Sequence, residues 1–165
     1  MTIKLTVLSA IGALLIGTLI AAMRVSPIPI ARAIAVAYVT IFRNTPLTLI
    51  ILFTSFGLYQ TMGVSLAPQS SPTFLNENNF RLAVLGLSVY TASFVAESLR
   101  SGINTVPVGQ AEAGRSLGMT FTQNVTIVVL PQAFRAVIGP LGSVLIALTK
   151  NTTIASVIGV AEASF

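Results

Sequence analysis

The sequence predicts an all-α integral membrane protein, and two observations lead to that fold class. Of the 165 residues, 54% are hydrophobic and 8% are charged, and the mean hydropathy is +0.90. Soluble domains carry about 25% charged residues, so lipid must be the solvent for much of this apolar surface. Long uncharged runs of helical length also alternate with short polar segments. We therefore expect a single transmembrane domain over residues 1–165.

The residue types that are absent or scarce exclude several functions. The chain has no Cys, His or Trp, which excludes thiol chemistry, imidazole catalysis and the usual zinc sites. The four acidic residues are too far apart in sequence to predict a metal site: Glu77, Glu97, Glu112 and Glu162. The net charge is +5, but the nine basic residues are spread singly and form no patch for nucleic acid.

The first expected span is residues 3–23, where Lys4 is the only charge. At about 1.5 Å per residue this run reaches about 31 Å, enough to cross a bilayer. A secretory signal peptide is the alternative, but the apolar run is too long and further apolar runs follow. Small residues recur at every fourth position and predict a ridge for close helix packing: Ser9, Ala13, Gly17 and Ala21.

The next segment combines an interfacial helix with a second span. Pro27 and Pro29 break helix, and residues 30–42 are then mostly apolar, with Arg32 near one end and Arg43 just past the other. We expect this helix to lie at the cytoplasmic interface. Residues 46–62 are uncharged and form the second expected span, which starts at Pro46 because proline suits a helix start.

Residues 63–79 read as a polar loop, and the third span follows at residues 82–99. The apolar run 82–96 alone would reach only about 22 Å, so the helix must continue through Glu97. Glu97 and Arg100 are spaced i, i+3 and predict a structural ion pair. A transport role for Glu97 is the less favoured alternative.

A polar island, the loop 105–120, has the local signals of a short helix. Pro107 suits its entry and Gly118 its end, and Glu112 and Arg115 have the spacing of an ion pair. A second helix start follows at Thr120, because Thr120 and Gln123 have capping-box spacing.

The fourth span is expected at residues 130–149, with kinks at Pro131 and at Gly139-Pro140. Residues 150–153 interrupt the apolar run, and a partial segment occupies 151–165. A stripe of small, progressively polar side chains follows one face: Gly139, Ser143, Ala147 and Asn151. With the N-terminus outside, six Arg residues fall on the cytoplasmic side against three basic residues outside, which also places the 105–120 loop in the cytoplasm.

This loop carries a resemblance. Glu112-Ala113-Gly114, three residues, Gly118, nine residues and Val128-x-Leu130-Pro131 resemble the EAA loop of ABC importer permeases without a gap. Gly114 stands where the family has a second Ala, at a cost of about 1 kcal/mol in helix propensity, and Val128 replaces Ile. Residues 43–47 and 150–153 resemble motifs of the polar amino-acid branch, and residues 80–84, 95–105 and 147–159 are similar to its actinobacterial glutamate importers.

The resemblance implies a type I, MetI-like helical bundle in a bacterial cytoplasmic membrane, crossed several times. Such permeases typically have five spans, so we expect this chain to be truncated at its C-terminus. It implies the permease subunit of an ATP-driven importer for polar amino acids, with glutamate suggested by the match. The chain would need no cofactor, because ATP and Mg²⁺ belong to a separate ATPase. The implied partners are an ATPase dimer, a second permease subunit in a homo- or heterodimer, an extracytoplasmic amino-acid-binding protein and membrane lipid.

The resemblance also implies the residues that act. Those coupling to the ATPase would be Gln110, Glu112, Ala113, Gly114, Arg115, Leu117 and Gly118. A weaker hypothesis places the substrate path at Ser143, Ala147, Lys150, Asn151, Thr152 and Thr153. Lys150 would attract a carboxylate, or else snorkel to the outer surface; the sequence leaves both open.

Three alternatives remain beside this interpretation. Residues 109–116 differ by one residue from a phosphate-binding loop, with Arg115 in place of Lys, but lack a preceding strand. A secondary transporter or channel would need no ATPase, and Glu97 alone is thin support for one. A membrane-embedded protease lacks a convincing nucleophile and base.

Overall fold

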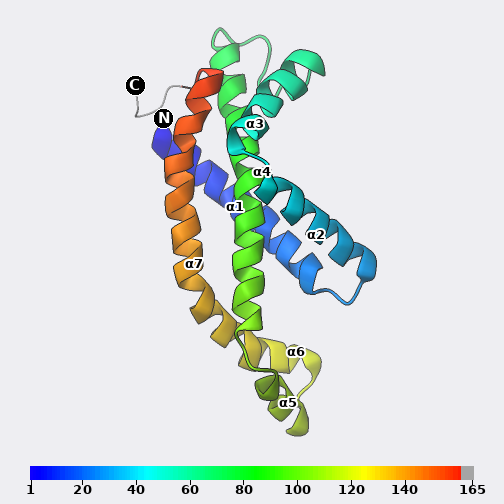
Figure 1. Ribbon diagram of the computed structural model, residues 1–165. Helices are drawn as coiled ribbons and strands as arrows, with labels where there is room; N and C mark the ends of the chain where they lie inside the picture. The colour runs from blue at the N-terminus through cyan, green and yellow to red at the C-terminus, as the bar shows by residue number, and fades with distance from the viewer. Residues whose placement is uncertain (161–165) are drawn as a thin grey trace.

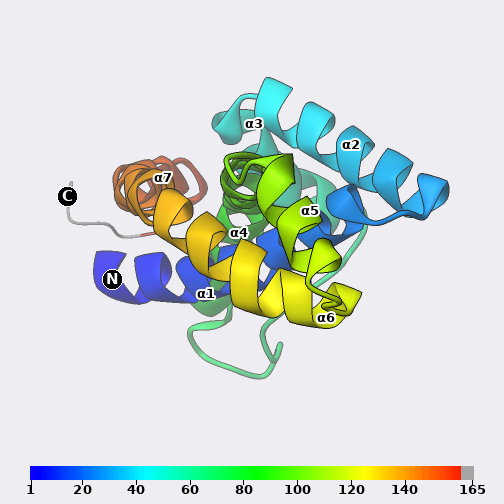
Figure 2. The same cartoon turned by 90° about the horizontal axis from the view of Figure 1, so that it is seen from below.

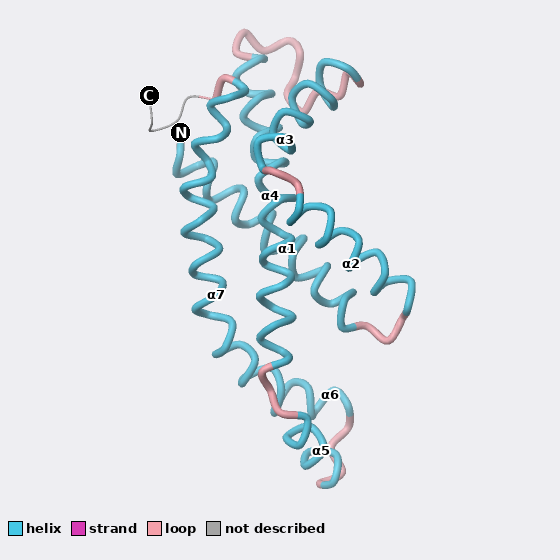
Figure 3. The backbone as a smooth tube through the Cα atoms, viewed as in Figure 1, coloured by secondary structure: helices cyan, strands magenta, loops and turns pink. Residues whose placement is uncertain are grey.

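The computed structural model describes residues 1–160, which form helices with no strand among them (Figures 1 and 3). The all-α prediction is confirmed. Two π-helical stretches, Phe53–Thr61 and Asn124–Val129, extend α3 and α6, and a 3₁₀ helix, Thr152–Ile158, continues α7. The α-helices are α1 (Thr2–Val25), α2 (Pro29–Asn44), α3 (Leu47–Leu52), α4 (Phe74–Asn104), α5 (Val108–Ser116), α6 (Phe121–Gln123) and α7 (Leu130–Asn151).

The long helix α4 lies at the centre of the bundle, with α1, α2 and α7 around it (Figures 1 and 2). Its 31 residues would reach about 46 Å, more than a hydrocarbon core needs. The main apolar core gathers side chains from α1, α3, α4, α7 and the 3₁₀ helix, among them the fully buried Leu5, Ile51, Leu87 and Leu148. At the C-terminal end of α4, the short helices α5 and α6 lie beneath the bundle (Figure 1).

The small-residue ridge of α1 is confirmed, because Ser9, Ala13, Gly17 and Ala21 are all buried. A Cβ atom added to Gly17 would lie 2.6 Å from the Val95 Cβ atom of α4. The Ser88 hydroxyl donates a hydrogen bond of 3.3 Å to the Ser9 carbonyl oxygen. The absence of bulky side chains therefore lets the two backbones approach closely, as expected where packing rather than hydrophobicity joins helices in lipid.

The second predicted span, residues 46–62, coincides in position with the helical arm Leu47–Thr61, which follows a sharp bend. Pro46 forces the preceding Thr45 into an extended conformation, with ψ at 129°, so α2 ends and α3 starts with a bend of 103°. The arm from Leu47 to Thr61 reaches only about 22 Å and is too short to cross alone. By length and composition, Thr2–Val25, Phe74–Asn104 and Phe121–Ile158 can each cross a membrane, and the bent pair α2 and α3 can add a fourth crossing.

The third and fourth predicted spans lie inside longer helices. Helix α4 begins at Phe74 within the expected polar loop, and the Thr73 hydroxyl before it donates a 2.6 Å hydrogen bond to the Glu77 carboxylate in its first turn. Residues 130–149 lie within the continuous helical run Phe121–Ile158. The π-helical stretch directly precedes Leu130-Pro131, whose ring cannot fit a regular preceding turn. Helix α7 continues through Pro140 without a break.

Exchanging Gly17 for Ala tests the contact between α1 and α4. The added methyl group must displace Val95, so we expect Gly17→Ala to lower the free energy of unfolding by about 1–3 kcal/mol. Gly142→Ala is the matched control, because nothing lies within 4 Å of a Cβ atom there. Thermal unfolding in detergent measures both. Equal stability of the two variants would contradict the close approach.

Candidate functional site

Helix α5 lies at the base of the molecule, beyond the end of α4 (Figures 1 and 2). Pro107 is its N-cap, and the chain leaves it through Gly118, whose φ of +80° suits glycine. Thr120 and Gln123 then form the predicted capping box at the start of α6. The helix, turn and second helix start predicted for this segment are confirmed.

A buried asparagine that the sequence did not single out holds α5 in place. The Asn124 side chain is 5% exposed and its Nδ2 donates a hydrogen bond of 2.6 Å to the Ala111 carbonyl oxygen. A Cβ atom at Gly114 would lie 2.6 Å from Asn124 Oδ1. The glycine that departs from the EAA pattern is therefore the residue that makes room for Asn124.

The other predicted coupling residues are exposed on α5 and the turn after it: Gln110, Glu112, Ala113, Arg115, Leu117 and Gly118. Leu117 is 79% exposed, and Phe121, which sequence reasoning missed, is 82% exposed. Within the described residues, Glu112 and Arg115 form no ion pair, contrary to their spacing. Their charged groups are thus available to a partner, and two apolar side chains stand beside them.

The phosphate-loop resemblance has no structural counterpart. Residues 109–116 lie inside the helix Val108–Ser116, so their backbone N–H groups from the second turn onward serve the helix rather than an open loop. A nucleotide site of that kind needs a strand before the loop, and residues 1–160 contain none.

Glu97 joins three helices through arginine side chains. Arg100 Nη2 lies 2.5 Å from Glu97 Oε1, which is the pair expected from the i, i+3 spacing. Arg24 Nη1 of α1 lies 2.5 Å from Glu97 Oε2, and Arg43 Nη1 of α2 lies 4.0 Å from the same oxygen. Only the fold brings Arg24 and Arg43 to Glu97, because 73 and 54 residues of sequence separate them from it. Beside this group, which we call the arginine cluster, lies a cavity of about 400 Å³.

A smaller cavity of about 160 Å³ lies between α4 and α7. It brings Ala147 and Asn151 of the predicted substrate path together with Tyr90 and Thr91, which the sequence did not indicate. The buried Thr91 Oγ1 has no hydrogen-bond partner within the described residues. We call this space the Asn151 cavity.

The remaining substrate-path candidates lie outside that cavity. Ser143, Lys150 and Thr153 are exposed, and the hydroxyls of Ser143 and Thr153 donate to the Gly139 and Lys150 carbonyl oxygens. Thr152 is fully buried and donates a hydrogen bond of 2.8 Å to the Thr149 carbonyl oxygen. Thr152 and Thr153 lie beyond the end of α7, where the helix changes from α to 3₁₀.

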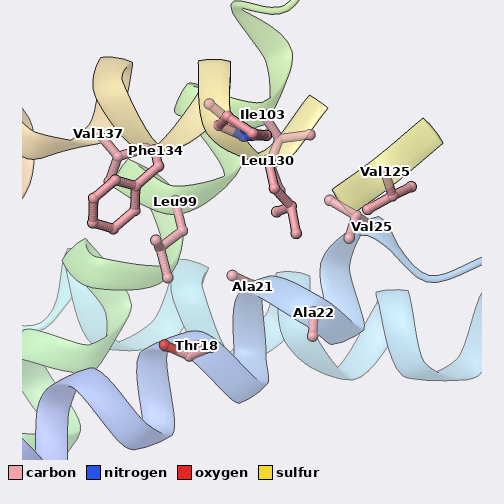
Figure 4. A pocket seen from close by; sticks show the side chains of 12 residues that line it. Thr18, Ala21, Ala22, Val25, Leu99, Ile103, Val125, Leu130, Phe134 and Val137 are labelled. Atoms are coloured by element: carbon pink, nitrogen blue, oxygen red, sulfur yellow. The ribbon is translucent and has the colours of Figure 1, made fainter. Parts of the chain in front are cut away.

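Another cavity, of about 620 Å³, lies between α1, α4 and α7 and is lined by apolar side chains apart from Thr18 (Figure 4). Thr18, Ala21 and Ala22 of α1 lie on one side of it, opposite Leu99 of α4 and Phe134 of α7 (Figure 4). Such a lining offers no partner for a charged group and does not suit a charged amino acid.

Comparison with known proteins places this arrangement in a family. Residues 13–163 match the family described as "Binding-protein-dependent transport system inner membrane component". The chain belongs to this family. The resemblance noted in the EAA-type loop is thereby confirmed, together with the multi-pass inner-membrane location.

Its relatives include amino-acid permeases. The chain is 66% identical over 163 residues to the glutamate transport system permease protein GluC of Corynebacterium efficiens, covering 99% of this chain and 72% of that protein. It is 39% identical over 155 residues to the arginine transport system permease protein ArgU of Corynebacterium glutamicum, covering 93% of this chain and 49% of ArgU.

Two solved structures share the fold. A crystal structure of an amino acid ABC transporter with histidines superposes with a TM-score of 0.84 at 36% identity, covering 96% of this chain and 69% of that one. The MetNI methionine ABC transporter superposes with a TM-score of 0.71 at 23% identity, covering 97% and 72%. The type I, MetI-like fold class is therefore confirmed.

Gly114→Ala tests the Asn124 brace. Alanine would favour an isolated helix by about 1 kcal/mol, but here its methyl group must displace the Asn124 amide, so we expect weaker protection of the Ala111–Ser116 region from proteolysis. Adding Asn124→Ser should relieve the crowding and restore much of the protection. Stronger protection of Gly114→Ala than of the unsubstituted protein would contradict the role of Asn124 in holding α5 in place.

Glu97→Gln tests the arginine cluster. Loss of the carboxylate leaves three guanidinium groups facing one another, and we expect unfolding in detergent to need about 1–2 kcal/mol less free energy. A double-mutant cycle with Arg24→Gln checks the cause, since the two changes should be non-additive. Additive effects would show that Arg24 and Glu97 act independently.

Proposed function

We propose that this chain is the permease subunit of an ATP-driven glutamate importer and that α5 transmits the ATPase motion to α4 and α7. The observation that carries the proposal is the exposed polar helix Val108–Ser116, with EAA-type spacing, at the base of a type I permease fold. Short segments join α5 to α4 on one side and to the helical run that contains α7 on the other. A displacement of α5 would therefore be passed to both membrane helices.

The ATPase would receive α5 as a helix in a groove. Glu112 and Arg115 supply unpaired charges for polar contacts, while Leu117 and Phe121 supply apolar anchors. ATP and Mg²⁺ would be bound by an ATPase dimer rather than by this chain, which would act in transport without catalysing hydrolysis.

Glutamate is the proposed substrate because GluC of Corynebacterium efficiens is 66% identical over nearly the whole of this chain. The Asn151 cavity supports a substrate path through α4 and α7, since Asn151 and Thr91 offer hydrogen bonds without a negative charge that would repel an anion. Exposed Lys150, one residue from Asn151, would attract a carboxylate toward this end of the molecule.

Transport would also need a second permease subunit, identical or different, and an extracytoplasmic binding protein that delivers glutamate. Helix α7 leaves much of its surface uncovered in this chain, including Phe134, Ile138 and Ile146, which lipid or the second subunit would cover. ATP binding and release would favour two states in turn, giving alternating access through differential binding.

Crosslinking tests the coupling role directly, and the chain has no native cysteine to interfere. Leu117→Cys in the permease, co-expressed with its ATPase and binding protein, should crosslink to the ATPase, and ATP should change the yield at least about threefold. Gln69→Cys, exposed in the loop before α4, is the control and should not crosslink.

ATP-dependent uptake of radiolabelled glutamate by the same assembly in liposomes tests the substrate. A crosslink at Leu117 without glutamate uptake would reject glutamate and keep the coupling role. The absence of any ATPase crosslink at Leu117 or at Glu112→Cys would reject coupling through α5.

A further inference from the structure

The arginine cluster carries more positive than negative charge. Arg24, Arg43 and Arg100 all lie within 4.0 Å of Glu97, and every ion pair of residues 1–160 involves this one carboxylate. Their side chains are only 20–43% exposed. Two guanidinium charges thus remain uncompensated in a half-buried place, where an additional anion would be stabilised.

Arg43 is the arginine with free hydrogen-bonding capacity. Arg24 and Arg100 hold Glu97 with short hydrogen bonds, whereas the Arg43 guanidinium makes no hydrogen bond within the described part of the chain. It lies 5.4 Å from the centroid of the Phe94 ring, a cation–π position that orients it without using its donors. A planar fork of this kind matches a carboxylate in a bidentate pair.

The cavity beside Arg43 has a largely polar lining and shares one lining residue with the Asn151 cavity. Thr40, Arg43, Asn44 and Glu97 line it, and so does Phe94. Phe94 also lines the Asn151 cavity, where its ring lies 5.0 Å from that of Tyr90. Phe94 therefore borders both cavities. Glu97 and Arg100 follow Phe94 along α4, so the arginine cluster lies nearer to the α5 end of that helix.

We propose that this cavity is a second binding site of the substrate path, in which Arg43 and Arg24 receive the carboxylate of an acidic amino acid after it passes Phe94. The inference rests on the proposed function for its ligand and adds an inner site to it. Arg43 makes the direct contact, Arg24 contributes charge, and Glu97 holds both arginines while limiting affinity, so that the anion can leave.

Thiol protection tests the site in the assembled permease and ATPase, without binding protein, in phosphatidylcholine nanodiscs. Thr40→Cys introduces the chain's only thiol into the cavity lining and leaves every charge in place. We expect L-glutamate to slow its labelling by a negatively charged methanethiosulfonate at least about fivefold. L-Glutamine, with the same shape and no net charge, should need about tenfold higher concentration for the same protection.

Arg43→Gln in the Thr40→Cys background should raise the half-protecting glutamate concentration about tenfold or more. Arg32→Gln is the matched control on the same helix, because Arg32 is bonded to the Ser26 carbonyl oxygen and lies outside the cavity lining, and should leave protection unchanged. If Arg43→Gln does not assemble, protection in the Thr40→Cys assembly alone still decides. No protection by glutamate there overturns the site.

Lipid supplies the competing anion. If phosphatidylglycerol nanodiscs slow labelling while glutamate has no effect, the cluster binds a lipid phosphate and the proposal is overturned. Intact ATP-driven glutamate uptake without protection at Thr40→Cys rejects only the inner site. If the full assembly shows neither ATP-driven glutamate uptake nor an ATPase crosslink at Leu117→Cys, the proposed function is rejected instead.

Discussion

The close contact of α1 with α4 is the constraint on which the rest of this structure depends. In lipid, apolar side chains gain little by leaving their solvent, so helices associate where their shapes allow backbones to approach. Ser9, Ala13 and Gly17 provide that shape on α1, and Ser88 and Val95 occupy the space on α4. Once α1 is seated, Arg24 at its last turn reaches Glu97.

Helix α4 carries residues of the Asn151 cavity and of the arginine cluster in order along its length. Asn79 near its start donates to the Ile158 carbonyl oxygen and fixes the end of the 3₁₀ helix. Tyr90 and Thr91 line the Asn151 cavity, and Glu97 gathers the arginines. The chain leaves α4 at Asn104 to enter α5. Helix α5 thus follows directly on the helix that lines both cavities.

Sequence reasoning predicted what depends on local pattern and missed what depends on distant contacts. The small-residue ridge, the capping box at Thr120 and the EAA-type spacing are local, and each has its expected structure. The brace at Asn124 could not be found, because nothing in sequence links it to Gly114. The apolar run predicted the position of the arm Leu47–Thr61, but not the 103° bend at Pro46 that joins this arm to α2. Coupling and transport by the individual residues stay predictions.

The low burial of α7 has a consequence for how the chain is built. In the most apolar stretch of the helical run Phe121–Ile158, which contains α7, 11% of the residues are buried, against 56% in that of α4. Such a helix gains little packing energy from its neighbours in this chain, so partition between water and lipid supplies much of the free energy that keeps it in the bilayer. Insertion would establish α7 as an independent helix before assembly, and substitutions on its outer face should alter membrane integration more than the cohesion of the bundle.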